Sequence, residues 1–458
     1  MTSKYRTRVF ALAVLIASCS PQAVVPSPSP TASMTASPSP SPVPATAAPG
    51  LVALIPARIS TDRRWYAMPD GLEQATVTFS VVFDADPTRG QPYVNVLKSA
   101  GGRPGADVVA LQRRTGNEWT ASLSLDRGYT PGEQTARVFE RLSRTDPTSD
   151  PPTLEVAGST SFLVTQPEYV VWTLDFEGDA SGDAELANTA AIADGLRIPT
   201  SVFWNPRVWT TSQVSPERQD AMLSWTKGRL AKGDEVALHL HMWTDYVRAA
   251  GLVPRTAPSW AGRGDGYDVP MTAYSETEQK ALIDHGLILM AAHGLPKPTS
   301  FRAGGDIGDA ATLRAVAAAG FNADCTAVAK DYPPIGRIPY PWTLPAGAQP
   351  YRPSSTDANA TGDLPLLEAP TIGGNTYAFT VQTIQPQIRA NLALFATAGT
   401  VAAERRAITI VSHPGTIVAA ERAAIEALLG AFGPLRYDAD AGPVRFVTLA
   451  QLAQAYGR

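Results

Sequence analysis

The chain has 458 residues, of which 44% are hydrophobic and 17% charged, and its formal net charge is −4 at pH 7. This length suits two or three domains, and the hydrophobic content is enough for a large core, which excludes wholesale disorder. The sequence has no basic stripe, so a nucleic acid is not an expected partner. Two cysteines, Cys19 and Cys325, exclude a disulfide framework and a cysteine-based zinc site, so any metal must be held by histidines and carboxylates.

Residues 1–18 have the pattern of a lipoprotein signal peptide. A basic start, Lys4 to Arg8, precedes an apolar run that is too short for a bilayer, which needs about 20 residues. Small residues then precede Cys19, as in the bacterial lipobox, whose cysteine is lipidated and becomes the mature N-terminus. We therefore expect a lipid on Cys19; the alternative is an ordinary signal peptide with an incidental cysteine.

Residues 19–57 form a linker rich in Pro, Ser and Ala, and no charged residue occurs in it. Such a segment cannot bury a core and favours extended polyproline geometry. At about 3.1 Å per residue it could reach on the order of 100 Å. Together with the lipid, which is the only expected membrane attachment, it would expose the folded part outside the cytoplasm in the cell envelope, within reach of a wall polymer.

Residues 58–166 show a period of two, which is typical of strands with one buried face. Alternating segments at 75–81, 119–125 and 136–139 are separated by turn clusters rich in Gly, Pro and Asp. The pattern predicts an antiparallel, immunoglobulin-like β-sandwich with no catalytic group. Trp65, Tyr66 and Trp119 are interpreted as core residues; the alternative is a sugar-stacking surface.

Residues 167–458 alternate between strands and helices, which predicts parallel strands joined by crossover helices. We expect a distorted parallel (β/α)7-type barrel. The expected strands are 169–174, 200–203, 235–238, 299–301, 407–411 and 446–449, and the expected helices are 183–193, 216–231, 275–293, 311–319 and 417–429.

Polar residues collect where these strands end, which is the face that carries active sites in parallel barrels. A spacing of two also places both members of a pair on one face of a strand. Two histidines and a carboxylate with open positions suit zinc or a similar divalent ion. The residues at the strand ends are Asp175, Glu177, His239, His241, Arg302 and His413.

Taken singly, each of these residues also fits a structural role: loop acids, a hydrogen-bonded core histidine pair, a surface ion pair or a strand cap. Their conjunction at the ends of several parallel strands favours a site. His285 and His293 fall in an expected helix and are assigned structural roles.

Six segments, in order, resemble motifs of the polysaccharide deacetylase family, also called carbohydrate esterase family 4. Thr173 to Gly178 looks like the family's Thr-Phe-Asp-Asp-Gly motif, with the second acid displaced by one place. The resemblance covers about Glu168 to the C-terminus and leaves out the sandwich. The other five segments are Gly195 to Phe203, Gly233 to His239, Ser300 to Gly305, Ala319 to Asp324 and Ile410 to Pro414.

The chain departs from the family pattern at three motifs. In the first, Glu177 is longer than the usual Asp and is shifted by one residue. Trp243 occupies the usual place of the second metal histidine, four residues after His239, so His241 would have to replace it. Ala303-Gly304-Gly305 stands where a stretch like Pro-Tyr-Gly is common.

The resemblance implies metal-assisted hydrolysis of an N-acetyl group. Glu177, His239 and His241 would hold a divalent ion, zinc being the expected one, which activates water and polarises the carbonyl. Asp175, held by Arg302, would be the general base, and His413 would protonate the leaving amine. Asp324 would set the pKa of His413.

The stretch from Tyr332 to Pro370 is expected to fold over the site, where Tyr351, Arg352 and Asp357 would contact sugar hydroxyls, unless they only form a polar loop. Three function classes follow: a deacetylase of an N-acetylated envelope or extracellular polysaccharide, a catalytically degenerate glycan-binding lipoprotein, and an amidase acting on a small non-sugar amide. The spacer and anchor favour the first two, and the base and acid pair favours the first.

Overall fold

The structure is a computed structural model that describes residues 54–87, 91–97, 106–139, 156–332, 336–376 and 393–457. The signal peptide, Cys19 and nearly all of the linker lie outside the described residues. The chain divides into two units, Met1–Ala53 and Leu54–Arg458, and the described residues belong to the second. Within the described ranges, no helix is both long and apolar enough to cross a membrane.

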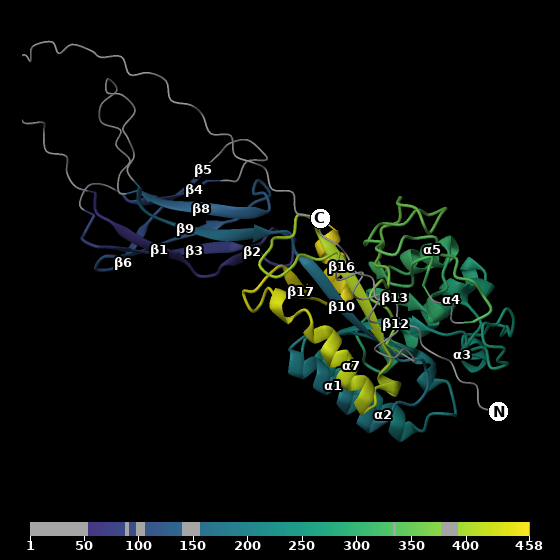
Figure 1. Ribbon diagram of the computed structural model, residues 1–458. Helices are drawn as coiled ribbons and strands as arrows, with labels where there is room; N and C mark the ends of the chain where they lie inside the picture. Colours follow the sequence, from purple (N-terminus) through teal and green to yellow (C-terminus); the bar gives the residue numbers. More distant parts are fainter. Residues whose placement is uncertain are drawn as a thin grey trace, which may run out of the picture. The chain divides into compact units, whose positions relative to one another are not determined.

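The N-terminal part of this unit, up to Thr165, consists of two β-sheets, with the strand orders β1-β3-β7-β6 and β2-β9-β8-β4-β5 (Figure 1). The strands are β1 (Ala57–Thr61), β2 (Trp65–Ala67), β3 (Thr76–Phe83), β4 (Tyr93–Leu97), β5 (Ala106–Ala110), β6 (Gln112–Thr115), β7 (Glu118–Ser124), β8 (Gly132–Phe139) and β9 (Val156–Thr165).

Alternation along β3 shows how the sandwich core forms. Val77, Phe79, Val81 and Phe83 are buried, while the residues between them are exposed or half-buried. This confirms the predicted sandwich, with one correction: β2 pairs with β9 in parallel, not antiparallel. β1 and β2 follow each other closely in the chain but lie in different sheets, and the chain passes from one sheet to the other around Asp62. The Asp62 carboxylate accepts a hydrogen bond from the Thr78 N–H at this crossing.

From Glu168 onward, parallel strands lie in the order β15-β14-β13-β12-β11-β10-β16, and β17 also pairs with β10. The strands are β10 (Glu168–Asp175), β11 (Ser201–Trp204), β12 (Glu235–Leu240), β13 (Ser300–Ala303), β14 (Ala323–Asp324), β15 (Leu367–Glu368), β16 (Arg406–Ser412) and β17 (Val444–Phe446).

The segment that follows β15 closes this sheet into a ring. Gly373 N–H donates to the Thr409 carbonyl of β16 at 2.8 Å, and Val411 N–H donates to the Gly374 carbonyl at 3.0 Å. The ring of parallel strands confirms the predicted distorted barrel.

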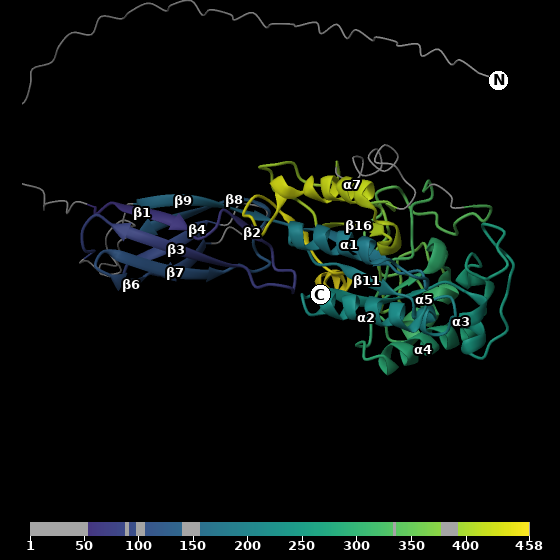
Figure 2. The same cartoon turned by 90° about the horizontal axis from the view of Figure 1, so that it is seen from below.

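Helices follow most of the strands, and α1 packs beside α7 just as α4 packs beside α5 (Figures 1 and 2). Side chains cap the starts of α2, α4, α5 and α8, as where Ser275 and Glu278 form a capping box at the start of α4. The α-helices are α1 (Asp183–Leu196), α2 (Pro216–Leu230), α3 (Thr244–Ala249), α4 (Glu276–Ala292), α5 (Ala310–Ala318), α7 (Ala419–Gly430) and α8 (Leu449–Tyr456); the 3-10 helices are η1 (Pro206–Trp209), η2 (Met271–Ala273), η3 (Gly304–Asp306), η4 (Pro414–Thr416) and η5 (Gly433–Leu435).

The end of the chain differs from the sequence prediction of a strand at 446–449. The strand ends at Phe446, and α8 begins at Leu449 because Thr448 caps it: Thr448 and Gln451 form a capping box. The short apolar run at this point is compatible with either a strand or the start of a helix, and the cap decides between them.

Strand alternation on β10 aims one side chain at the open end of the barrel. Val170, Trp172 and Leu174 belong to a large cluster of buried hydrophobic residues that the strands share with the surrounding helices. Tyr169 and Val171 belong to a separate, smaller hydrophobic cluster, which also contains side chains of β11, β12 and β14. A period of two therefore places Asp175, at the carboxyl end of β10, on the inner face.

Asp234 is a buried anchor at the other end of the barrel, directly before β12. Its carboxylate accepts hydrogen bonds from the Thr200 N–H at 3.1 Å, the Thr200 hydroxyl at 2.6 Å and Arg229 Nε at 2.6 Å. We predict that Asp234→Ala lowers the free energy of unfolding by about 3 kcal/mol, because the buried Thr200 N–H and hydroxyl and the Nε of the buried Arg229 all lose their acceptor, although Arg229 keeps its pair with Asp194. Urea denaturation measures this change.

The matched control is Asp284→Ala, which removes an exposed pair with Lys280 one helical turn away. Its expected cost is below about 1 kcal/mol, because water screens such pairs. Equal costs for the two variants would show that Asp234 is not an anchor.

Candidate active site

A fully buried ion pair lies at the centre of the barrel mouth. Arg302, the third residue of β13, donates from Nη1 to Asp175 Oδ1 at 2.9 Å, and its side chain is 0% exposed. Nη1 also donates to the Thr173 hydroxyl at 2.9 Å, while Nε donates to the Cys325 carbonyl and Nη2 to the Thr371 hydroxyl, both at 3.0 Å. Arg302 is thereby fixed by three segments of the barrel: β10, the residue after β14 and the chain after β15.

This pair keeps Asp175 ionised. Burial by itself raises the pKa of the Asp175 carboxyl, but the charge and the hydrogen bond of Arg302, together with the nearby His239 and His413, bring the pKa below its ordinary value. The second oxygen of Asp175 remains available, 3.9 Å from His239 Nε2. An ionised carboxylate with one free oxygen can accept a proton.

Two histidines next to this pair are held as neutral imidazoles. His239 Nδ1 lies 3.1 Å from the Arg302 carbonyl and His241 Nδ1 lies 3.0 Å from the Tyr267 carbonyl, so each Nδ1 carries the proton and donates it. Burial lowers the pKa of both histidines to about 4. Each Nε2 therefore keeps a lone pair for an electrophile.

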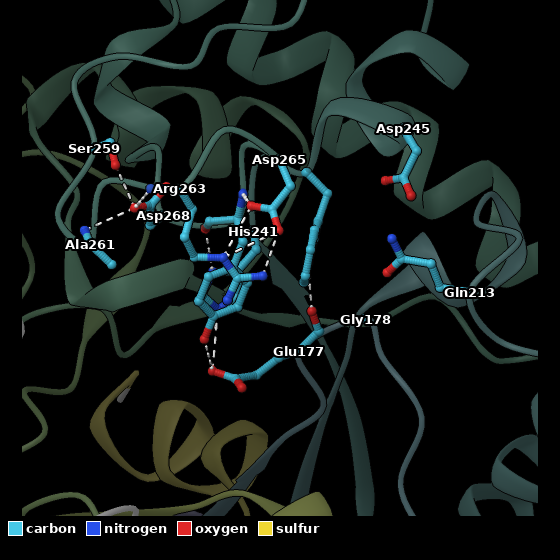
Figure 3. Close-up of polar contacts among 12 residues, drawn as sticks. Glu177, Gly178, Gln213, His241, Asp245, Ser259, Ala261, Arg263, Asp265 and Asp268 are labelled. Carbon is cyan, nitrogen blue, oxygen red and sulfur yellow. Dashed lines mark hydrogen bonds and ion pairs between the residues drawn. The ribbon is translucent and has the colours of Figure 1, made fainter.

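Glu177 is placed among polar groups from three loops. One carboxylate oxygen, Oε1, accepts a hydrogen bond from the Tyr267 hydroxyl at 2.7 Å, and it lies 3.6 Å from His241 Nε2 and 3.5 Å from His413 Nε2. Figure 3 shows Glu177 directed toward the His241 ring. The Tyr267 ring also stacks on His241, with the two centroids 4.3 Å apart.

The variant arginine motif makes room for His241. A β-carbon on Gly304 would lie 2.6 Å from His241 Nδ1, closer than real contacts allow. Two of the departures from the family pattern, His241 and Gly304, are therefore physically linked: the ring occupies the volume that a side chain at position 304 would fill.

The donor set fits a divalent metal ion. His239 Nε2 is buried and has no hydrogen-bond partner among the described residues, which is how a ligand nitrogen looks without its ion. Two donors bound to one tetrahedral zinc at 2.0–2.2 Å lie about 3.4 Å apart, close to the separation of His241 Nε2 and Glu177 Oε1. As placed, however, no three His, Cys, Asp or Glu side chains of the described ranges form a complete metal group, so the three-ligand set stays a prediction.

Two residues near these groups, Tyr267 and Asp306, are not predicted from the sequence. Tyr267 comes from the long loop before α4, where no periodic pattern marks it. Asp306 follows Gly304-Gly305 and is only 8% exposed, and its pKa responds to the charges of Arg302 and Asp175. A lone acid after a Gly-Gly pair is the only sequence signal for it.

Asp324 lies next to the site rather than in it. It is fully buried, and its Oδ1 accepts a hydrogen bond from the Thr326 N–H at 2.7 Å. Burial raises the pKa of the Asp324 carboxyl and of the neighbouring Glu368 carboxyl. The group next to His413 Nε2 is Glu177, and the proposed effect of Asp324 on His413 stays a prediction.

The residues predicted to bind sugar have contacts elsewhere. The Tyr351 hydroxyl donates to the Ala358 carbonyl, and Asp357 accepts from the Asn359 N–H. Arg352 lies beside Gly457, at the end of α8, and α8 packs at the amino ends of the strands, where Leu449 N–H donates to Ser201. The structure does not bring these three side chains to Asp175, and their role stays a prediction.

Neither a family model nor a curated protein matches the sequence. Three of the solved structures that it resembles come from bacteria. One is a presumed polysaccharide deacetylase from Mycobacterium smegmatis (14% identity, 69% of this chain and 94% of that one, TM-score 0.39). The others are a family 4 carbohydrate esterase from Streptomyces lividans (11%, 59% and 89%, 0.30) and a peptidoglycan deacetylase from Bacillus subtilis (14%, 63% and 92%, 0.30).

We predict that Gly304→Ala displaces the His241 ring and loosens its stack on Tyr267. A misplacement of about 1 Å at such a site costs on the order of 10²-fold in activity. Zinc retained after dialysis should fall along with any hydrolytic activity, while circular dichroism stays that of the folded chain.

Gly195→Ala is the matched control, because a β-carbon on this residue of α1 meets nothing within 4 Å. It should leave zinc content unchanged and stabilise the helix by about 0.5–1 kcal/mol. Unchanged zinc content in Gly304→Ala would mean that His241 is not a ligand.

Proposed function

We propose that this protein is a metal-dependent hydrolase that removes N-acetyl groups from a polysaccharide. The observation that carries the proposal is the buried Asp175–Arg302 pair beside two neutral imidazoles. A protein that only binds glycans needs neither the ionised carboxylate of Asp175, held by Arg302, nor two neutral imidazoles, His239 and His241, beside it.

The chain's own groups fit amide hydrolysis. Asp175, kept ionised by Arg302, takes the proton of the attacking water through its free oxygen. His413, at the end of β16, protonates the nitrogen as the C–N bond breaks, so that an amine leaves. A bound divalent ion, with zinc as the expected one, would polarise the acetyl carbonyl and lower the pKa of its water; His239, His241 and Glu177 would hold it.

The proposed substrate belongs to the cell envelope or extracellular matrix. This part of the proposal rests on the sequence of residues 1–57, in which a lipidation motif precedes an uncharged, proline-rich spacer. A lipid on Cys19 would tether the protein to a membrane outside the cytoplasm, and the spacer would let the barrel reach a polymer.

One observation favours a second candidate, a glycan-binding protein that has lost turnover. In the described ranges the Glu177 carboxylate is bonded to Tyr267 rather than joined with His239 and His241 in a complete metal group. The two candidates differ in whether acetate is released. A small-amide hydrolase, the third candidate, would release acetate or another acid without preferring a polymer.

The test is acetate release from N-acetylated glycans by the zinc-loaded protein and by Asp175→Asn. We predict that the variant loses about 10²–10⁴-fold in turnover, the usual contribution of a positioned proton acceptor. It should retain its zinc, since Glu177, His239 and His241 remain, and Arg302 should keep its three other acceptors.

Asp183→Asn is the control for this experiment, because the Asp183 side chain is 86% exposed at the start of α1. It should release acetate like the unsubstituted protein. Loss of zinc together with activity in Asp175→Asn would make Asp175 a ligand instead of the base.

A second prediction concerns the anchor. Cys19→Ser should move the protein from the membrane fraction to the soluble fraction of expressing cells, because no thiol remains to carry the lipid. Cys325→Ser is the control, since Cys325 is a buried thiol inside the barrel; it should stay with the membranes. Equal distribution of the two variants would refute lipidation of Cys19.

A further inference from the structure

Tyr267 contacts two of the three expected metal ligands but has no part in the mechanism above. Its hydroxyl donates to Glu177 Oε1 at 2.7 Å, and its backbone carbonyl lies 3.0 Å from His241 Nδ1. Its ring stacks on the His241 ring, and the two planes differ by 6°. One residue thus fixes the direction of the carboxylate and both the tautomer and the plane of the imidazole.

The loop that carries Tyr267 is itself fixed against the chain that follows β12. The Thr244 N–H donates to the Asp265 carbonyl at 2.8 Å. Gly266, next to Tyr267, has φ +82°, and a β-carbon there would collide with the Met242 carbonyl oxygen. Glycine is the residue that tolerates both this conformation and this close approach. Tyr267 therefore makes its contacts from a loop whose position is set by its own backbone.

Trp243 holds the backbone of Glu177. Its indole Nε1 donates to the Glu177 carbonyl at 2.8 Å, and the residue is 5% exposed. The buried Arg207 guanidinium lies over the indole, with Cζ 3.7 Å from the ring centroid, and its Nη1 donates to the Gly178 carbonyl at 2.8 Å. A desolvated guanidinium on a tryptophan face is a favourable cation–π contact. Two successive carbonyls are thus bound by one stacked pair, which fixes the chain from which the Glu177 carboxylate extends.

Position 243 is the place where the family pattern has its second metal histidine. In this chain the side chain at 243 is directed at the Glu177 backbone and lies against Tyr267, with the two ring centroids 4.9 Å apart. An imidazole is smaller than an indole, so a histidine there would lose packing against Arg207 and Tyr267 and leave the Glu177 carbonyl without its donor. The tryptophan is therefore part of the structure that supports Glu177.

We propose that Tyr267 and Trp243 are positioning residues of the metal site, which hold Glu177 and His241 where both can bind one divalent ion. This inference rests on the proposed metal-dependent function. Groups that orient metal ligands by hydrogen bonds contribute about 10- to 100-fold to metal affinity. Trp243 then compensates for the histidine that it replaces, and a histidine put back at position 243 weakens metal binding instead of restoring it.

The test measures the zinc affinity of the metal-free protein by competition with a chromophoric chelator, so it does not depend on acetate release. Tyr267→Phe removes only the hydroxyl and leaves the carbonyl and the ring in place. We expect its Kd for zinc to rise about 10- to 100-fold, and that of Trp243→His to rise at least as much. The visible absorption of bound Co²⁺ should change in Tyr267→Phe, because it reports the ligands and geometry of the ion.

Two control variants make the same chemical changes elsewhere. Tyr274→Phe removes a hydroxyl that accepts from the Arg255 N–H at 2.9 Å, at the end of η2. Trp119→His removes a tryptophan of the sandwich that also has an arginine over its ring, with Arg113 Cζ 4.9 Å from the centroid. Both should bind zinc like the unsubstituted protein, and circular dichroism shows whether each variant is folded.

The outcomes separate this inference from the proposed function. If the unsubstituted protein binds no zinc, or if His239→Ala binds it as tightly, these residues hold no metal and the proposed metal-dependent function fails. If zinc binding depends on His239 but is unchanged or tighter in Tyr267→Phe or in Trp243→His, the positioning role is refuted while the hydrolase function stands. If Trp243→His does not fold, Trp243→Phe takes its place with the same expected direction, because it keeps a flat ring under Arg207 and lacks the indole donor.

Discussion

The buried guanidinium of Arg302 is the constraint on which the rest of the site depends. A buried charge is tolerable only when it is paired and hydrogen-bonded, and the Arg302 guanidinium at 0% exposure is paired with Asp175 and also donates to two threonine hydroxyls and the Cys325 carbonyl. These partners come from β10, from the residue after β14 and from the chain after β15, so the charge joins strands that are distant in sequence. Its own carbonyl also fixes the tautomer of His239. Arg302 thus acts twice: its side chain keeps Asp175 ionised, and its backbone carbonyl leaves the lone pair of His239 on Nε2.

The departures from the family pattern form one coherent set. Gly304 leaves space for the His241 ring, and Tyr267 stacks on that ring and bonds to Glu177. Degeneration would remove groups one by one and leave voids or unpaired charges. Here the His241 ring lies where a β-carbon on Gly304 would be, and Tyr267 contacts both His241 and Glu177, so these groups fit together as one packed cluster.

Sequence periodicity predicts most of this fold, because hydrophobic alternation and helix caps are local properties. The strands β10, β11, β12, β13 and β16, the helices α1, α2, α4, α5 and α7, and the strand-end positions of Asp175, His239, Arg302 and His413 follow from it. The short strands β14 and β15 and the loop from Tyr332 to Pro370 have no periodicity of their own. Tyr267 belongs to the site only through tertiary packing. Tyr351 and Arg352 show the converse, since their polarity serves loop and helix contacts away from Asp175.

The proposed N-deacetylation is tested most directly by incubating an N-acetylated glycan with the zinc-loaded protein in ¹⁸O-labelled water and measuring the amine and acetate formed. We expect free amine and acetate in equal amounts, with one labelled oxygen in the acetate, and we expect chelation of the metal to stop the formation of both. Retention of the glycan by the zinc-loaded protein, with neither amine nor labelled acetate formed, would contradict it.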